Sequence, residues 1–309
     1  MADERIWKKS STPRLWRHHA CFALLAAAIV AITWTLLRNL TVYSLQDQSS
    51  SHIILIPFIA ACLIFAARDA VFVKAVWSTA YGAMMIAAGL VAYFSFRSLG
   101  LAPGSWGFAG ATIALIATCM GAFLLCYGAS AVRAALFPLL FLLLATPWPA
   151  PILNRVIYLL QQGSAAITYD LFRLAGVPVL RKGVLLSVPG ITIEVAQECS
   201  SIRSSIALFI TCLLAAHYSL RKAWRVWFFV ALATVFSVVK NGIRIATLTL
   251  LSIYVDPRFL SGPLHRDGGI VFFLLALVML WPVLLFLQKS ETAQGRSEMV
   301  KPINELAVR

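Results

Sequence analysis

Long apolar segments dominate the chain and set the first limit on its fold. A helix of roughly 20 residues rises about 30 Å, enough to cross the hydrocarbon core of a bilayer. The sequence therefore predicts an all-α polytopic membrane protein with about eight transmembrane helices. These apolar segments lie near residues 19–37, 52–67, 76–96, 106–127, 133–149, 200–217, 224–252 and 269–288.

The charge balance fits a membrane protein better than a nucleic-acid-binding one. Hydrophobic residues make up 61% of the sequence and charged residues only 12%, which excludes an ordinary soluble globular chain. The net charge of +14 comes from Lys and Arg dispersed among the helix ends, whereas a nucleic-acid phosphate backbone requires a clustered stripe. We therefore expect membrane lipids, and no nucleic acid, as partners.

Basic residues in the short connections predict the orientation. They precede the first apolar segment and follow the second, the sixth and the last, and such residues favour the cytoplasmic side. Both termini are thus predicted to be cytoplasmic, although basic residues also occur in the long segment 150–199. The expected organisation is a basic N-terminus (1–18), one transmembrane domain (19–288) and a polar tail (289–309), with 38–51, 97–105, 150–199 and 253–268 facing outward.

The long outward segment 150–199 is predicted to carry structure of its own. Residues 154–175 have the apolar spacing of a helix that lies on the membrane surface. The following GVLLSVPGITIEVA alternates β-branched residues around Pro189-Gly190, a turn dipeptide. We therefore expect a hairpin of two short strands that runs almost directly into Cys199.

Cys199 differs from the other cysteines of the chain because it lies at the mouth of a helix, within ECSSIRSS. The free N–H groups of a first helical turn favour a thiolate. Arg203 follows Cys199 by four residues, so it lies on the same helical face one turn deeper. Glu198, Cys199 and Arg203 are all expected at or just under the membrane surface. The alternative is an incidental cysteine beside a snorkelling arginine. The remaining cysteines lie in apolar runs with no zinc or disulfide spacing: Cys21, Cys62, Cys119, Cys126 and Cys212.

Two further polar groups are expected at the same depth. Arg244, in VVKNGIRIATL, falls in the outer half of the bilayer, where a guanidinium requires a cavity or a partner, and Asn241-Gly242 could loosen the helix there. His265 and Asp267 belong to GPLHRDGGIVFF, just before the last helix. A structural arginine bonded to loop carbonyls and a solvated surface histidine are the alternatives. The three motifs together predict a site at the outer face.

The ordered set ECSSIRSS, NGIR and HRDGG resembles the exosortase/archaeosortase family of membrane transpeptidases. The stretch SSSHIILIPFIA at 49–60 is also similar to an early histidine motif of that family, so the resemblance covers roughly residues 40–288. Ser201 and Ile53 stand where the family commonly has glycine, and Gly-Gly-Ile ends the histidine motif where an aromatic residue is frequent. These differences leave the subfamily open.

The resemblance implies roles for individual residues. Cys199 would be the nucleophile, Arg244 would stabilise the thiolate and the oxyanion, and His265 would be the general acid and base. Arg203 and His52 match flanking positions of the family motifs. Three further secondary positions come from the motifs of this sequence itself: Asn241, Glu198 and Asp267. This chemistry also suits the residues themselves, since a thiolate at a helix start can attack a peptide carbonyl and a histidine can protonate the leaving amine.

The resemblance also implies a substrate class and a location. Members cut secreted proteins at a C-terminal sorting signal (PEP-CTERM-like), which consists of a short motif, a transmembrane helix and a basic tail. They pass the protein to an envelope acceptor, such as a lipid or a polysaccharide. The expected location is the cytoplasmic (inner) membrane of a prokaryote, with the active site on the extracytoplasmic face and with no cofactor or metal.

Two other classes of protein remain open. A lipid-linked glycosyltransferase or acyltransferase also works at the outer membrane face with a histidine, but it would not require Cys199. A transporter could hold Arg and His within its spans. It predicts polar residues along a path to the cytoplasmic side, whereas in this sequence they gather at the outer face. Substitution of Cys199 separates the transpeptidase from both.

Overall fold

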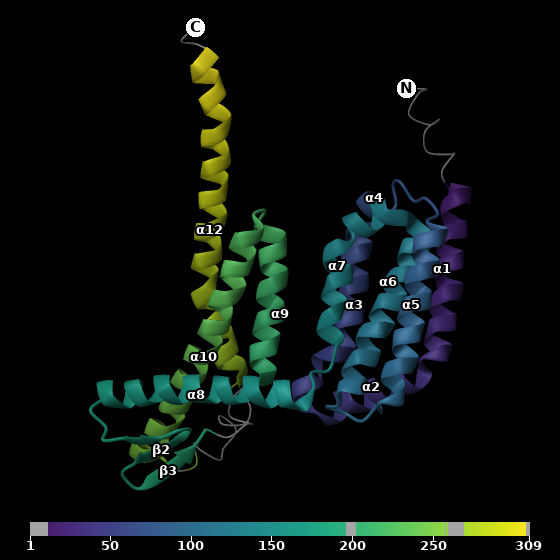
Figure 1. Ribbon diagram of the computed structural model, residues 1–309. Coiled ribbons are helices and arrows are strands. Elements are labelled where there is room, and N and C mark those ends of the chain that lie inside the picture. Colours follow the sequence, from purple (N-terminus) through teal and green to yellow (C-terminus); the bar gives the residue numbers. More distant parts are fainter. Residues whose placement is uncertain (1–11, 196–201, 257, 259–268, 307–309) are drawn as a thin grey trace. The chain divides into compact units, whose positions relative to one another are not determined.

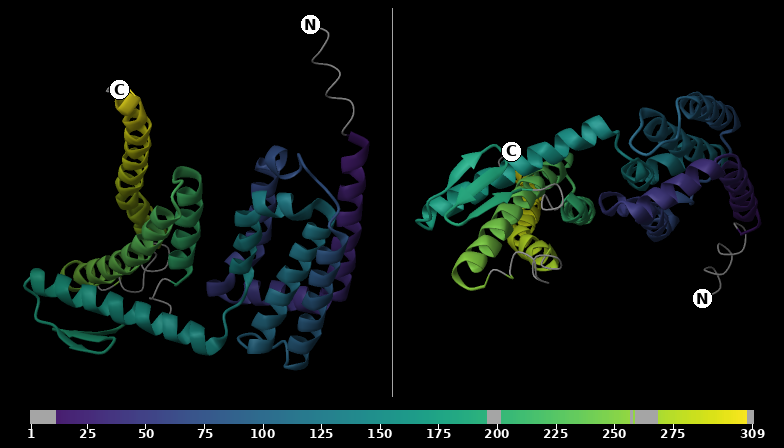
Figure 2. Two further views of the ribbon diagram at one scale, coloured as in Figure 1. Left: turned by 45° about the horizontal axis from the view of Figure 1, so that its top comes forward. Right: turned by 90° about the horizontal axis from the view of Figure 1, so that it is seen from below.

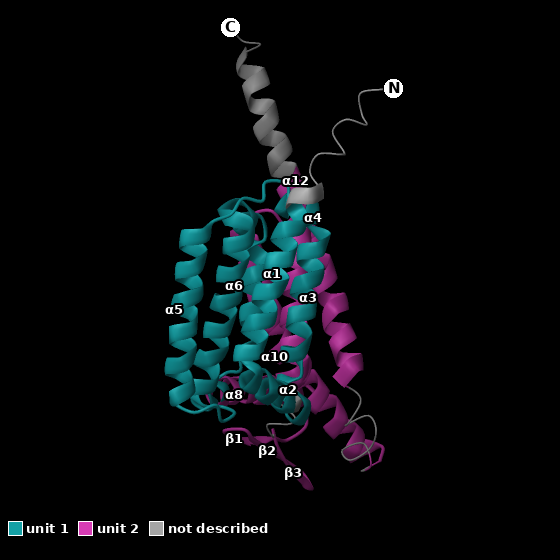
Figure 3. Ribbon diagram, turned by 90° about the vertical axis from the view of Figure 1, so that its right-hand side faces the viewer, with its two compact units in different colours: residues 1–153 teal, residues 154–309 magenta. Residues whose placement is uncertain are grey.

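The computed structural model describes residues 12–195, 202–256, 258 and 269–306, and most of them are helical. Among these residues, six helices are long and apolar enough to cross a membrane, or up to seven if the bent pair Leu136–Ala145 and Ala150–Leu174 is one span. The prediction of a polytopic helical membrane protein is confirmed. The chain divides into two compact units, Met1–Leu153 and Asn154–Arg309 (Figure 3).

Unit 1 is a helical bundle in which α5 and α6 form the closest pair. Their backbones approach so closely that a Cβ at Gly82 would lie 2.4 Å from the Cα of Leu125, and one at Gly89 would lie 2.4 Å from Oγ1 of Thr118. Small residues at such contacts are how membrane helices gain packing energy. The elements are α1 (Thr12–Ile32), α2 (Trp34–Gln46), η1 (Gln48–Ser50), α3 (His52–Ala66), α4 (Arg68–Val71), α5 (Thr79–Ser98), α6 (Trp106–Ala134), α7 (Leu136–Phe141) and η2 (Leu142–Ala145).

Two of the eight predicted segments are shorter than expected. Segment 52–67 forms α3, a helix of 15 residues. Segment 133–149 contains the last two residues of α6, followed by α7 and η2, whose ten residues rise about 15 Å, half the thickness of the hydrocarbon core. Pro147 and Pro149 follow, and proline and the residue before it disfavour continued helix. The first segment, 19–37, also breaks at Thr33, and α2 lies across one end of the bundle (Figure 1).

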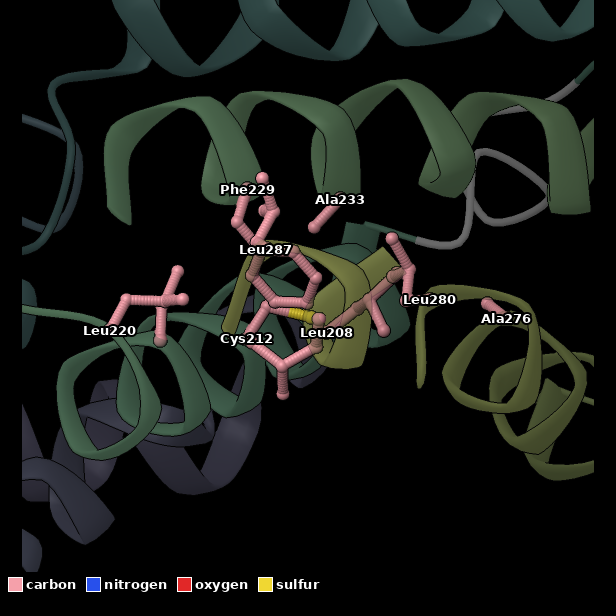
Figure 4. Close-up of a cluster of buried hydrophobic side chains, with 10 residues drawn as sticks. Leu208, Cys212, Leu220, Phe229, Ala233, Ala276, Leu280 and Leu287 are labelled. Atoms are coloured by element: carbon pink, nitrogen blue, oxygen red, sulfur yellow. The ribbon is translucent and has the colours of Figure 1, made fainter. Parts of the chain in front are cut away.

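Unit 2 contains three apolar helices that pack on one another: α9 (Ile202–Ser219), α10 (Ala223–Tyr254) and α12 (Gly269–Leu306). Leu208 and Cys212 of α9, Phe229 of α10 and Leu280 of α12 belong to one buried cluster (Figure 4). In the turn that follows the last residue of α9, the backbone N–H groups of Arg221 and Lys222 donate hydrogen bonds to the carboxylate of Glu291, at 2.9 Å and 2.7 Å. The turn between α9 and α10 is thereby tied to α12.

The predicted surface helix is α8 (Ala150–Leu174), which crosses α9 and α10 instead of running alongside them (Figures 1 and 2). Its buried residues recur at helical spacing along one face: Ile157, Gln161, Ser164, Ala165, Thr168 and Phe172. Ala165 and Phe172 share a buried cluster with Leu186 and Val195 of the sheet segment and with Ile245 of α10. One face of α8 thus holds both the sheet and α10.

The predicted hairpin is confirmed and gains a third strand. Strands β2 (Leu185–Val188) and β3 (Ile191–Glu194) pair antiparallel around Pro189-Gly190, where Gly190 takes the positive φ of 84° that such a turn requires. Strand β1 (Leu180–Lys182) adds to the other edge of β2. The sequence prediction missed β1 because its Arg181 and Lys182 lack the β-branched alternation that marked the other two strands.

Candidate functional site

Four of the predicted site residues lie outside the described residues: Glu198, Cys199, His265 and Asp267. The other four lie within them: His52, Arg203, Asn241 and Arg244. The described chain reaches Val195 before Cys199 and resumes at Ile202 after it. The contacts at these two points show how the chain is held on either side of the predicted nucleophile.

The chain before Cys199 is anchored to α8 and to the sheet. Val195 is fully buried, and its backbone N–H donates to the carbonyl oxygen of Val184 at 3.1 Å. The carbonyl oxygen of Val195 accepts a hydrogen bond from Nε2 of Gln161, itself buried, at 2.7 Å. Both polar groups of this backbone unit are satisfied inside the protein. The position of the chain four residues before Cys199 is thereby fixed.

The chain after Cys199 is anchored to α10. Nζ of Lys240 donates a hydrogen bond to Oγ of Ser204, and Oγ of Ser237 donates to Oγ of Ser205 at 2.6 Å. Ser204 and Ser205 follow directly after Arg203 in the first turns of α9. The start of α9 is therefore joined to α10 by two polar contacts, one helical turn apart.

Lys240 is a residue that sequence reasoning did not assign to the site. Only 4% of it is exposed, although a lysine at the centre of a membrane helix costs about 3 kcal/mol on insertion scales. Its signal was present, since it is a cation inside the apolar run of α10, beside Asn241 and four residues before Arg244. Burial and pairing with Ser204 could not be read from the sequence because they depend on the packing of α9.

A second set of polar contacts joins α10 to α8. Nδ2 of Asn241 donates to Oγ of Ser164 at 3.0 Å, and Oγ1 of Thr168 donates to the carbonyl oxygen of Gly242 at 3.2 Å. A Cβ at Gly242 would lie 2.6 Å from Cγ2 of Ile167, so only glycine allows this approach. The expectation that Asn241-Gly242 loosens the helix is wrong. Helix α10 is continuous here, and the dipeptide serves close packing.

The two arginines near the predicted nucleophile differ in environment. Arg203 is exposed, whereas Arg244 is half-buried. Arg244 lies one turn beyond Lys240 on the same face of α10, toward the end at which α9 begins, and it interacts electrostatically with Lys240. The structure therefore brings Arg244 together with the Lys240 and Ser204 contact. This half-buried guanidinium is the better placed of the two for an interior role.

His52 belongs to unit 1, where it closes a turn. Its Nδ1 donates to the carbonyl oxygen of Ser49 at 3.2 Å, and it also bonds to the backbone of Leu144. In the same turn the carboxylate of Asp47 accepts hydrogen bonds from the hydroxyls of Ser49 (2.5 Å) and Ser50 (2.6 Å). Burial would raise the pKa of Asp47, but these hydrogen bonds outweigh it and hold the pKa below its usual value. A role of His52 in chemistry stays a prediction.

Comparison with known proteins gives one match. The family model described as transmembrane exosortase matches residues 44–282, which is most of the chain. No curated protein and no solved structure matches the chain. The matched range includes the turn with His52, the anchored segments on both sides of Cys199, and Arg244. On the extent of this match, the chain belongs to the transmembrane exosortase family.

Proposed function

We propose that the chain is a membrane cysteine peptidase and transpeptidase of the exosortase type. It cleaves the C-terminal sorting signal of secreted proteins at the extracytoplasmic face and passes the protein to an envelope acceptor. The observation that carries this proposal is the anchoring on both sides of Cys199, by Gln161 before it and by Lys240 after it. A nucleophile benefits from such fixed surroundings, because misplacement by about 1 Å can cost about a hundredfold in rate.

The proposed reaction begins with attack by the thiolate of Cys199 on the carbonyl carbon of the scissile peptide bond. The carbonyl oxygen gains negative charge, which hydrogen bonds from the guanidinium of Arg244 stabilise. The C–N bond then breaks, and His265 delivers a proton to the leaving amine nitrogen. The product is an acyl-thioester on Cys199, and the C-terminal helix with its basic tail is released.

The second half of the reaction transfers the acyl group. A nucleophile of the acceptor, or water, attacks the thioester carbonyl and gives its proton to His265. The C–S bond breaks and the thiolate of Cys199 is restored. Membership of the exosortase family supports this reaction class. The acceptor, a lipid or a polysaccharide of the envelope, takes part in this step only through the nucleophilic group that attacks the thioester.

The experiment that tests this function is co-expression with a secreted reporter that ends in a Pro-containing motif, a transmembrane helix and a basic tail. We expect the C-terminal helix to be removed, with a mass change on the remaining protein that identifies the acceptor. A reporter without the motif is the control. If the signal stays intact while both proteins reach the membrane at normal levels, the proposed function is rejected.

The location is the second part of the proposal: the inner membrane of a prokaryote, with both termini in the cytoplasm. Reporter fusions after Lys74 and after Lys222 are expected to report cytoplasm, because basic residues flank both sites. A fusion at Gly190, in the exposed turn between β2 and β3, is expected to report the exterior. A cytoplasmic signal at Gly190 would place β3 and Cys199 on the wrong side for secreted substrates.

A further inference from the structure

Lys240 is a cation in the interior of unit 2 whose hydrogen bond reaches across to another helix. It lies within α10, is 4% exposed, and donates from Nζ to Oγ of Ser204 in the first turn of α9. An ionisable residue inside a membrane helix points to function, because its burial is unfavourable and an apolar residue would serve packing better. The contact with Ser204 indicates which part of the molecule Lys240 acts on.

The neighbouring contact shows that helix packing alone does not require a lysine. One turn away, the same two helices are joined by the hydroxyls of Ser237 and Ser205 at 2.6 Å. Ser237 is as well buried as Lys240, at 3% exposed, and carries no charge. A neutral side chain is therefore sufficient to bond α9 to α10 at this depth. The charge of Lys240 needs another reason.

That reason lies one turn along α10, at Arg244. In a helix, side chains lean toward the N-terminus, so the side chain of Arg244 naturally leans back over the position of Lys240. The two like charges interact, and like charges four residues apart repel each other. This repulsion disfavours a guanidinium folded back along α10 and favours one directed toward the level at which α9 begins.

We propose that Lys240 is a positioning residue of the transpeptidase: through Ser204 it fixes the first turn of α9, and by repulsion it keeps the guanidinium of Arg244 from folding back along α10. This inference rests on the proposed function of Cys199 and Arg244. Lys240 itself does not touch the substrate. Its effect is on how the first turn of α9 and the guanidinium of Arg244 lie relative to each other.

The test uses the full-length protein in lipid nanodiscs with the reporter that carries the motif, the helix and the basic tail. Lys240→Met removes the charge and the hydrogen bond at similar volume. We expect the processing rate at saturating reporter to fall about tenfold to a hundredfold, with the half-saturating concentration unchanged. The thermal midpoint should stay the same or rise, because a buried cation has been removed. A purely structural lysine predicts the reverse pattern of lost stability and unchanged rate per folded molecule.

Further variants separate the two parts of the mechanism. Lys240→Arg keeps the charge and should recover part of the rate. Ser204→Ala should also slow processing, and adding it to Lys240→Met should cost little more, because the two residues act through one contact. Ser237→Ala is the matched comparison: it removes the neighbouring bond between the same helices without removing a charge, so it should lower the thermal midpoint and slow processing much less than Lys240→Met does.

A measurement without substrate distinguishes failure of this inference from failure of the proposed function. The rate at which iodoacetamide alkylates Cys199, followed by peptide mass spectrometry, should fall in Lys240→Met and change much less in Ser237→Ala. Equal alkylation and equal processing by Lys240→Met and the parent protein would overturn the role of Lys240 alone. A parent protein that leaves the reporter uncut would instead reject the function, and the alkylation comparison would still decide on Lys240.

Discussion

Replacement of Cys199 by alanine is expected to abolish processing of the secreted reporter. Without the thiol no acyl-thioester can form, and the remaining groups have no covalent step to assist. Loss of a nucleophile typically lowers the rate by about a millionfold, which is below detection in a cellular assay. The measurement is the fraction of reporter that loses its C-terminal helix, normalised to the amount of membrane-inserted enzyme.

Cys212→Ala is the matched control for this prediction. Cys212 lies in the same unit, is 2% exposed, and packs in the cluster between α9, α10 and α12. Its replacement is expected to lower stability slightly and to leave processing intact. A lipid-linked glycosyltransferase or acyltransferase and a transporter both predict that Cys199→Ala works as well as the parent, so that result would favour those classes.

Single replacements of Arg244 and His265 by alanine should come close to the loss seen for Cys199. Members of a cooperating set give strongly non-additive losses, because removing one leaves the others without a task. Adding Arg244→Ala to Cys199→Ala should therefore change nothing further. A double variant much slower than either single one would mean that the residues act independently.

Arg244→Lys is expected to lose nearly all activity, whereas Arg203→Lys should retain a measurable fraction. Arg244 is half-buried beside Lys240, and an ammonium there would lack the planar fork of donors that can reach a developing oxyanion. Removing such a donor typically costs about a hundredfold or more in rate. Arg203 is exposed on α9, where a lysine can replace it with less loss of activity.

Both arginine variants must first be quantified in the membrane, because a misplaced charge can lower the amount of inserted protein. The processing rate is then compared per inserted molecule. A normal Arg244→Lys together with an inactive Arg203→Lys would show that the two roles are assigned the wrong way round. In that case the exposed arginine at the start of α9, and not the one on α10, supports the oxyanion.

Helix positions could be predicted from the sequence where apolar runs are long, and less well where they are short. The runs that became α6, α10 and α12 were recognised because their length alone implies a span. Segment 133–149 was misjudged because hydropathy counts its residues as apolar without registering that Pro147 and Pro149 end the helix. Strand β1 was missed because its pairing with β2 depends on the turn at Gly183 and not on its own composition.

The site could be predicted at the level of motifs but not of contacts. Arg244 and Asn241 were identified from their place in an apolar helix, and the structure describes both beside polar neighbours. Lys240 was passed over because nothing in the sequence says that α9 presents Ser204 to it. Gly242 was misread for a related reason: its role is set by the side chain of Ile167 on another helix. Contacts between residues of different helices depend on the tertiary packing, which the sequence pattern of one helix does not specify.

The anchors at Val195 and at Ser204 have a consequence for how the chain tolerates changes in length. Val195 is bonded to α8 and Ser204 is bonded to α10. The number of residues between these two anchors is therefore constrained, whatever the residues are. One added residue would keep every chemical group and still displace the thiol. At the exposed Pro189-Gly190 turn, by contrast, an insertion lengthens only a loop. Relatives of this chain should therefore differ freely in length at the tip of the hairpin and keep a constant count from its last strand to the helix that follows.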